Sequence, residues 1–185
     1  MEFRLVYRGP LKANGSVDDK QKLRRAFHGQ LRELWNQLPL KEITEFLKAK
    51  PAARKISLIH PIDTFQFAPL VSARINLICG LNILFLRPGE PGSLIQHGGD
   101  IDNRLKTLLD GLRMPKDSRE LPSGDHPLPD EDPFFCLLED DALVTNVSVT
   151  TDPLLEQAQP TEVVLVVQVS VRATRVSNDN IGLIG

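Results

Sequence analysis

The sequence predicts a single α+β domain in which helices pack on one face of a mostly antiparallel or mixed sheet. Three observations carry this prediction. The 185 residues, 41% of them hydrophobic, suffice for one sizeable core. Patterns typical of strands and helices follow one another in the order β, α, α, β, β, α, β, β. No internal repeat or coiled-coil heptad interrupts them. We assign residues 1–173 to this domain and expect residues 174–185 to form a loosely ordered tail.

The N-terminal part predicts a strand followed by a long helix. Residues 2–8 alternate polar and apolar side chains and stop at Gly9 and Pro10, which is typical of a short strand. Ser16 and Asp19 have the spacing of a capping box, which marks the start of a helix. The apolar residues that follow recur at helical spacing: Leu23, Phe27, Leu31, Leu34 and Leu38.

The middle of the chain predicts a second, short helix and two strands. Pro39 ends the long helix, and residues 41–50 are typical of a short one. Residues 64–71 and 74–87 are rich in β-branched and aromatic residues, so we expect two strands. Gly80 interrupts the second strand and indicates a bulge or turn there.

The remaining segments predict one more helix and two more strands. Residues 88–99 are rich in glycine and proline and predict a flexible loop. A helical pattern runs over residues 100–113. Five prolines in residues 114–133 predict a long loop that packs poorly. Residues 137–150 and 163–172 are typical of strands.

Composition narrows the classes of function. Cys79 and Cys136 lie in no CxxC motif or His-rich cluster, so we expect two buried thiols rather than a disulfide framework or structural zinc. No stretch approaches the ~20 apolar residues of a membrane span, and the start lacks a signal-peptide core, so we expect a cytoplasmic protein without a membrane partner. Walker and Gly-x-Ser-x-Gly motifs are absent. Few aromatic residues disfavour a single-strand binder that stacks bases.

Charge is distributed unevenly along the chain. The net charge is −2, but residues 1–60 carry a net +7 and residues 121–185 a net −9. Such asymmetry indicates a surface that faces a polyanion, although it also fits two ends that balance each other for solubility. The alternative for the long helix itself is a solvated polar face. We expect its basic residues to contact DNA phosphates: Lys20, Lys22, Arg24, Arg25 and Arg32.

The densest candidate site is the helix that begins at Asp100. Asp100 at the N-cap and Asp102 in the first turn suit the positive end of the helix dipole. Lys106 and Asp110 follow Asp102 at spacings of four. These features alone describe an ordinary stabilised helix. The competing interpretation is that Asp100 and Asp102 bind a hard divalent cation, with a third carboxylate from residues 139–141.

Two linked motifs here resemble those of the RusA-type Holliday junction resolvases. Residues 100–112 read Asp-Ile-Asp-Asn-Arg-Leu-Lys-Thr-Leu-Leu-Asp-Gly-Leu, and residues 139–144 read Glu-Asp-Asp-Ala-Leu-Val. Members of that family show Asp-x-Asp-Asn-x-x-Lys-x-x-x-Asp-x-Leu on a helix, followed by Asp-Asp-x-x-Val at a strand. The resemblance implies a RusA-like fold and a homodimeric, Mg²⁺-dependent endonuclease that nicks branched DNA, with Mn²⁺ as a substitute ion.

The resemblance also implies roles for individual residues. Asp100, Asp102 and Asp141 would be the catalytic metal ligands, with Asp140 as an alternative to Asp141, and Lys106 would be the catalytic lysine. Asn103 and Asp110 match the motif and would cap the helix or orient the ligands. His97, close to the motif, is a candidate for contacting phosphate or carrying a proton; the alternative is a solvated loop residue.

Two other functions stay open at this point. One is a DNA-binding or complex-assembly protein that keeps the fold without cleaving. The other is a nuclease for another DNA structure, since the proline-rich loop 114–133 is longer than the family's usual link between the motifs and residues 41–50 look like an addition.

Overall fold

A computed structural model describes residues 1–51, 56–88, 100–159 and 161–183, and within them the chain forms an α+β domain with two mixed sheets. The larger sheet has the strand order β1-β7-β4-β6 and the smaller one β2-β3-β5. The larger sheet consists of β1 (Glu2–Pro10), β7 (Glu162–Ala173), β4 (Leu77–Arg87) and β6 (Val144–Pro153). The smaller sheet consists of β2 (His60–Ile62), β3 (Phe65–Val71) and β5 (Phe134–Leu138).

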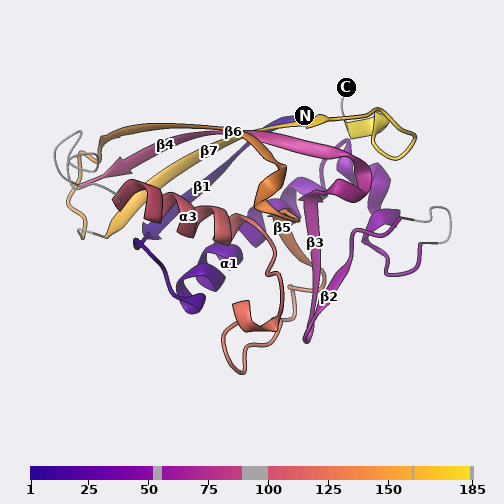
Figure 1. Ribbon diagram of the computed structural model, residues 1–185, viewed down its shortest axis with the longest axis horizontal. Helices are drawn as coiled ribbons and strands as arrows, with labels where there is room; N and C mark the ends of the chain where they lie inside the picture. The colour runs from indigo at the N-terminus through magenta and orange to yellow at the C-terminus, as the bar shows by residue number, and fades with distance from the viewer. Residues whose placement is uncertain (52–55, 89–99, 160, 184–185) are drawn as a thin grey trace.

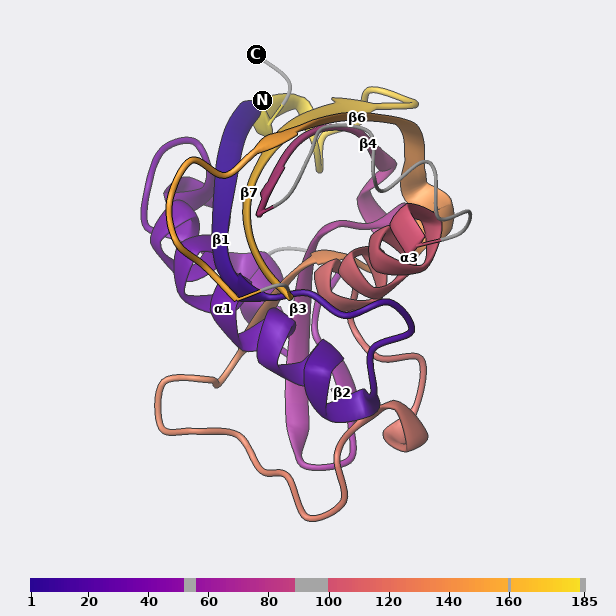
Figure 2. The same ribbon diagram turned by 90° about the vertical axis from the view of Figure 1, so that its left-hand side faces the viewer.

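The two long helices lie on the same side of the four-stranded sheet, as Figures 1 and 2 show. Helix α1 spans Val17–Trp35 and helix α3 spans Asp100–Leu112. The predicted class and the one-sided packing of these helices are therefore confirmed. The prediction of one sheet was wrong: β4 pairs antiparallel with β7 but parallel with β6, and β3 pairs parallel with β5 in a second sheet.

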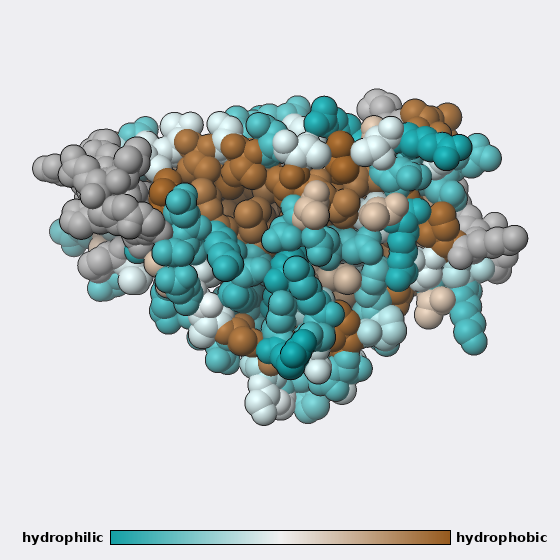
Figure 3. All heavy atoms as spheres, viewed as in Figure 1, coloured by the Kyte–Doolittle hydropathy of each residue, from teal (hydrophilic) through white to brown (hydrophobic). Residues whose placement is uncertain are grey.

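The core lies between this sheet and the helices. Inward side chains of β4 and β7 alternate with outward ones, because successive residues of a strand point to opposite faces. From α1, the core receives Leu23, Phe27 and Leu31. Figure 3 shows a band of apolar side chains below the strands and polar atoms over much of the surface beneath it. The opposite face of the sheet carries no described helix.

Local signals predicted several element boundaries, but the single strand expected over residues 137–150 was wrong: β5 and β6 belong to different sheets and a turn separates them. Helix α1 begins at the capping box, in which Ser16 and Asp19 bond each other's backbone N–H. It ends at Trp35, earlier than expected, and Leu38 beyond it is 70% exposed. The expected second helix is a run of 3-10 turns, η1 (Leu40–Leu47). The bulge at Gly80 is confirmed by a register shift between Cys79 and Gly80.

Two segments expected to be loose are held in place. In residues 114–133 the chain forms the short turn η3 (Ser118–Glu120) and buries Leu121 and Glu131. In the C-terminal segment the buried amide of Asn180 donates to the carbonyls of Ile75 and Arg175, and Leu183 packs into the core. The proline-rich loop and the tail through residue 183 are thus parts of the domain. The flexible loop predicted over residues 88–99 lies outside the described residues from residue 89 on.

No helix in the described ranges is long and apolar enough to cross a membrane. Both cysteines are buried free thiols, as expected.

Candidate functional site

Helix α3 presents part of the acidic motif to solvent. Its leucines face the core, so the positions between them face outward, and Asp102 and Lys106 are both exposed one turn apart. Asp100 is the first residue of α3, but its side chain lies outside the described part of the chain. His97 lies outside it as well. Within the described part, the outward face of α3 thus offers one carboxylate and one ammonium group.

The second acidic motif lies toward the other end of α3. Asp140 caps the turn η4 (Asp141–Leu143) by accepting from the Ala142 N–H, which holds the pKa of Asp140 below its ordinary value. The nearby Lys116 ammonium, 3.9 Å from the Asp140 carboxylate, acts in the same direction. Lys116 follows the C-terminus of α3, whereas Asp102 is ten residues before its last residue, about 15 Å of helix rise.

This arrangement bears directly on the expected metal ligands. In the described ranges no three His, Cys, Asp or Glu side chains are grouped to hold a metal ion. Asp102, Asp140 and Asp141 are all described, so they do not form such a group. A site that joins Asp100 and Asp102 to Asp141 stays a prediction, because the carboxylate of Asp100 is outside the described atoms.

A polar pocket of about 150 Å³ lies between α3 and the turn before α1. Three motif residues line it, and they belong to one face of α3: Asn103, Lys106 and Asp110. Thr107 of α3 and Lys20 of α1 also line it, and the turn adds Asn14 and Gly15. Three residues of the motif therefore gather around this pocket.

The charge of Asp110 is compensated inside the fold. Its carboxylate lies 2.7 Å from the ammonium of Lys20 and 2.7 Å from the guanidinium of Arg113. Burial opposes ionisation of Asp110, but these two cations outweigh it and hold the pKa of Asp110 below its ordinary value. Asp110 is consequently a structural ion-pair partner, and Lys20, expected to contact DNA, is already paired with it.

Arg24 is not part of an exposed basic face, and the expectation that it contacts DNA was wrong. Its side chain is 1% exposed. The guanidinium donates to the carbonyls of Asp110 and Arg113 at 3.0 Å each, and to the carbonyl of Glu120 at 3.3 Å. Since the last carbonyls of a helix lack partners within the helix, Arg24 of α1 caps the C-terminus of α3.

Two more of the expected DNA contacts bind the proline-rich loop instead. Arg25 donates to Glu131 at 2.8 Å and to Asp125 at 2.9 Å, and Arg32 donates to Asp130 at 2.7 Å. The positive N-terminal part and the negative C-terminal part of the chain therefore neutralise each other across α1. Of the five expected contacts, Lys22 is exposed and has no ion-pair partner within the described ranges.

His28, on the same helix, fixes this loop as well. Its Nδ1 accepts from the backbone N–H of Phe135 at 2.9 Å, so the proton must reside on Nε2, which faces the carbonyl of Asp130 at 3.1 Å. Burial lowers the pKa of His28. No local sequence pattern indicates either contact, because the partners lie more than 100 residues apart along the chain.

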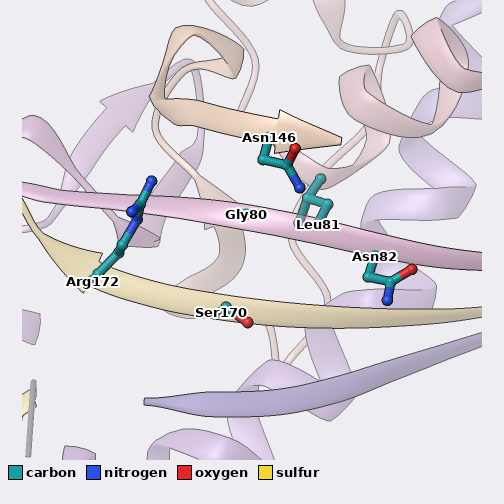
Figure 4. A pocket seen from close by; sticks show the side chains of 6 residues that line it. All are labelled: Gly80, Leu81, Asn82, Asn146, Ser170 and Arg172. Carbon is teal, nitrogen blue, oxygen red and sulfur yellow. The ribbon is translucent and has the colours of Figure 1, made fainter. Parts of the chain in front are cut away.

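A second hollow, of about 350 Å³, lies on the outward face of the four-stranded sheet (Figure 4). Gly80 has no side chain to fill the sheet surface between Asn146 and Ser170, its partners on the neighbouring strands. Arg172, at the rim, donates to Thr145. This hollow faces away from α1 and α3, so it is separate from the motif.

Comparison with known proteins finds no matching family model, no matching curated protein and no matching solved structure.

Proposed function

We propose that this protein is a divalent-metal-dependent endonuclease that nicks branched DNA, like the RusA-type resolvases that its motifs resemble. The observation that carries the proposal is the exposure of Asp102 and Lys106 on one side of α3, beside a pocket lined by further motif residues. An ordinary amphipathic helix has no need to place an unpaired lysine and an amide, Lys106 and Asn103, at one pocket.

The donor chemistry of the first turn of α3 fits Mg²⁺. Magnesium binds oxygen ligands, commonly one or two carboxylates completed by waters and substrate phosphate oxygens, and Mn²⁺ accepts the same donors. We assign Asp100 and Asp102 as the primary ligands, and Asp141, with Asp140 as the alternative, as the third. When bound, the ion would supply an activated water and stabilise charge on the phosphodiester.

The chain's own residues contribute binding and electrostatics. Lys106 lies one turn from Asp102 and offers its ammonium to the negative phosphate, whose charge grows during cleavage. Lys22 is exposed on α1 and contributes a contact to the DNA backbone. We further propose that the enzyme acts in the cytoplasm.

A homodimer is the proposed assembly. Strand β6 is an edge strand, and its Val147 is 42% exposed. Half-buried Leu105 and Leu109 of α3 add to the apolar surface of the domain. Exposed apolar surface of this kind is typical of protein interfaces. Sedimentation of the wild type and of Val147→Glu tests this: a dimer that the substitution dissociates supports it, and a monomeric wild type contradicts it.

Cleavage of a four-way junction tests the nuclease proposal. Purified protein with Mg²⁺ or Mn²⁺ should nick the junction, and Asp102→Asn should not. Asp18→Asn is the matched control, because Asp18 is an exposed first-turn acid of α1 outside the motif. Asp141→Asn is assayed separately. Full cleavage by that variant overturns the assignment of Asp141 without affecting Asp102.

A second candidate function is a DNA-binding protein that does not cleave. The separation of Asp140 from Asp102 along α3 favours it. It predicts that the wild type binds the junction without nicking it under either metal. Flap and linear duplex substrates in the same assay distinguish a junction nuclease from a nuclease for another DNA structure.

A further inference from the structure

We propose that the pocket between α3 and the turn at Asn14 and Gly15 binds one phosphate group of a nucleic-acid backbone. The inference rests on the proposed function for the source of that phosphate. Of the described candidate ligands, neither Asp102 nor Asp141 lines the pocket.

The charge of the lining favours an anion. Lys106 and Lys20 enter the pocket from two different helices, and among the described lining residues Asp110 alone is acidic. The carboxylate of Asp110 is also held by Arg113, so it does not cancel both lysines. A site with excess positive charge attracts a negatively charged group.

Hydrogen-bonding groups of the pocket are available to a ligand. In the part of the chain that the structure describes, the side chains of Lys106, Asn103 and Asn14 have no hydrogen-bond or ion-pair partner. An ammonium and two amides supply donors, as phosphate oxygens require. The volume of about 150 Å³ is several times what one water needs, so a tetrahedral group fits.

The walls of the pocket are fixed before any ligand arrives. The Gly15 N–H donates to Thr107 Oγ1 at 2.9 Å, and that hydroxyl donates to the Asn103 carbonyl at 3.0 Å. A Cβ on Gly15 would lie 2.6 Å from Thr107 Cγ2, so only glycine permits this approach. Because the turn is hydrogen-bonded to α3, the binding groups lose little conformational freedom when the phosphate binds.

Lys106 connects the pocket to the proposed nuclease site. It lines the pocket and lies one turn from Asp102. A strand whose phosphate occupies the pocket would place its neighbouring phosphates near the first turn of α3. The pocket would therefore anchor the DNA strand, and Lys106, which lines it, would face both the anchored phosphate and the neighbouring phosphate that is cleaved.

Phosphate titration followed by NMR, with EDTA present to remove divalent ions, tests the proposal. Inorganic phosphate should shift the amide signals of Gly15 and Thr107 saturably. Lys106→Gln should weaken this binding roughly tenfold, as expected for loss of one charge-assisted hydrogen bond. Lys41→Gln, which removes an exposed lysine outside the pocket and outside α1, should leave the affinity within about twofold.

Two further arms identify the source of the phosphate and separate the two proposals. A short oligothymidine should shift the same amides, whereas its uncharged methylphosphonate analogue should not. Asp102→Asn should keep phosphate binding while it loses cleavage. Absence of a saturable shift at Gly15 and Thr107, or equal affinity in Lys106→Gln, overturns the pocket even if the wild type cleaves DNA. If the wild type binds phosphate but never cleaves DNA, the result supports the phosphate pocket and contradicts the nuclease proposal.

Discussion

Replacing Arg24 by methionine tests the role that the structure gives to this arginine. Methionine keeps much of the side-chain length but removes four hydrogen bonds of a buried guanidinium, three to backbone carbonyls and one to the side-chain oxygen of Gln21. Hydrogen bonds from a charged donor contribute about 1.5–3 kcal/mol each and are not additive. Each carbonyl left buried without a partner costs a further desolvation penalty of about 1–3 kcal/mol. We therefore expect the free energy of unfolding to fall by about 3–5 kcal/mol.

Urea denaturation at neutral pH measures this change, and Lys22→Met is the control. Lys22 is on the same helix but exposed, so its substitution should change the free energy of unfolding by no more than about 0.5 kcal/mol. DNA affinity is measured below the unfolding transition. It should be unchanged for Arg24→Met, whereas Lys22→Met should bind DNA more weakly and with less dependence on salt. A loss below about 1 kcal/mol for Arg24→Met, or a loss of DNA affinity equal to that of Lys22→Met, would refute the reasoning.

Three other variants or conditions give clear expectations. Gly111→Ala should destabilise by about 1–3 kcal/mol in thermal unfolding despite alanine's better helix propensity, because the new Cβ would lie 2.6 Å from Leu23 Cβ; a more stable variant contradicts this. Burial lowers the pKa of His28 from its ordinary 6.5, so the unfolded chain takes up the proton first and stability should fall as the pH drops below about 6.5; His28→Gln should flatten that dependence, and an unchanged slope contradicts it. Burial raises the pKa of Cys79 to about 11 and of Cys136 to about 12, so neither thiol should react with a thiol reagent at pH 8 until urea unfolds the protein; rapid reaction in the native state contradicts it.

The sequence predicted well those features that depend on neighbouring residues. Ser16 and Asp19 bond each other across one helical turn, so their spacing alone marks the start of α1. The bulge at Gly80 and the leucine stripe of α3 are likewise local signals. The motif positions Asn103, Lys106 and Asp110 share one helix face for the same reason, and they line one pocket.

Features set by distant parts of the chain were missed. Arg24, Arg25 and Arg32 look alike in a helical pattern, yet one is buried and two pair with acids about 100 residues away. A sum of charges along the chain does not say which charges meet in space. Glu131 of the proline-rich loop forms an ion pair with Arg25. No local pattern shows this pairing, so the sequence predicts a loop that packs poorly.

The distance between the two acidic motifs is also a consequence of topology. Met114 donates to the carbonyl of Leu138, which places the end of β5 beside the end of α3 and carries Asp140 and Asp141 to that end. The order of the two motifs along the chain does not show which end of α3 lies beside the second motif.

The rate of junction nicking with Mg²⁺ under single-turnover conditions tests the central claim most directly. The wild type and Asp18→Asn should nick at the same rate, whereas Asp102→Asn should be slower by at least about a thousandfold, as expected when a charged metal ligand is lost. Equal rates for Asp102→Asn and the wild type, or no nicking by a folded wild type with either Mg²⁺ or Mn²⁺, would contradict the assignment of α3 as the catalytic helix.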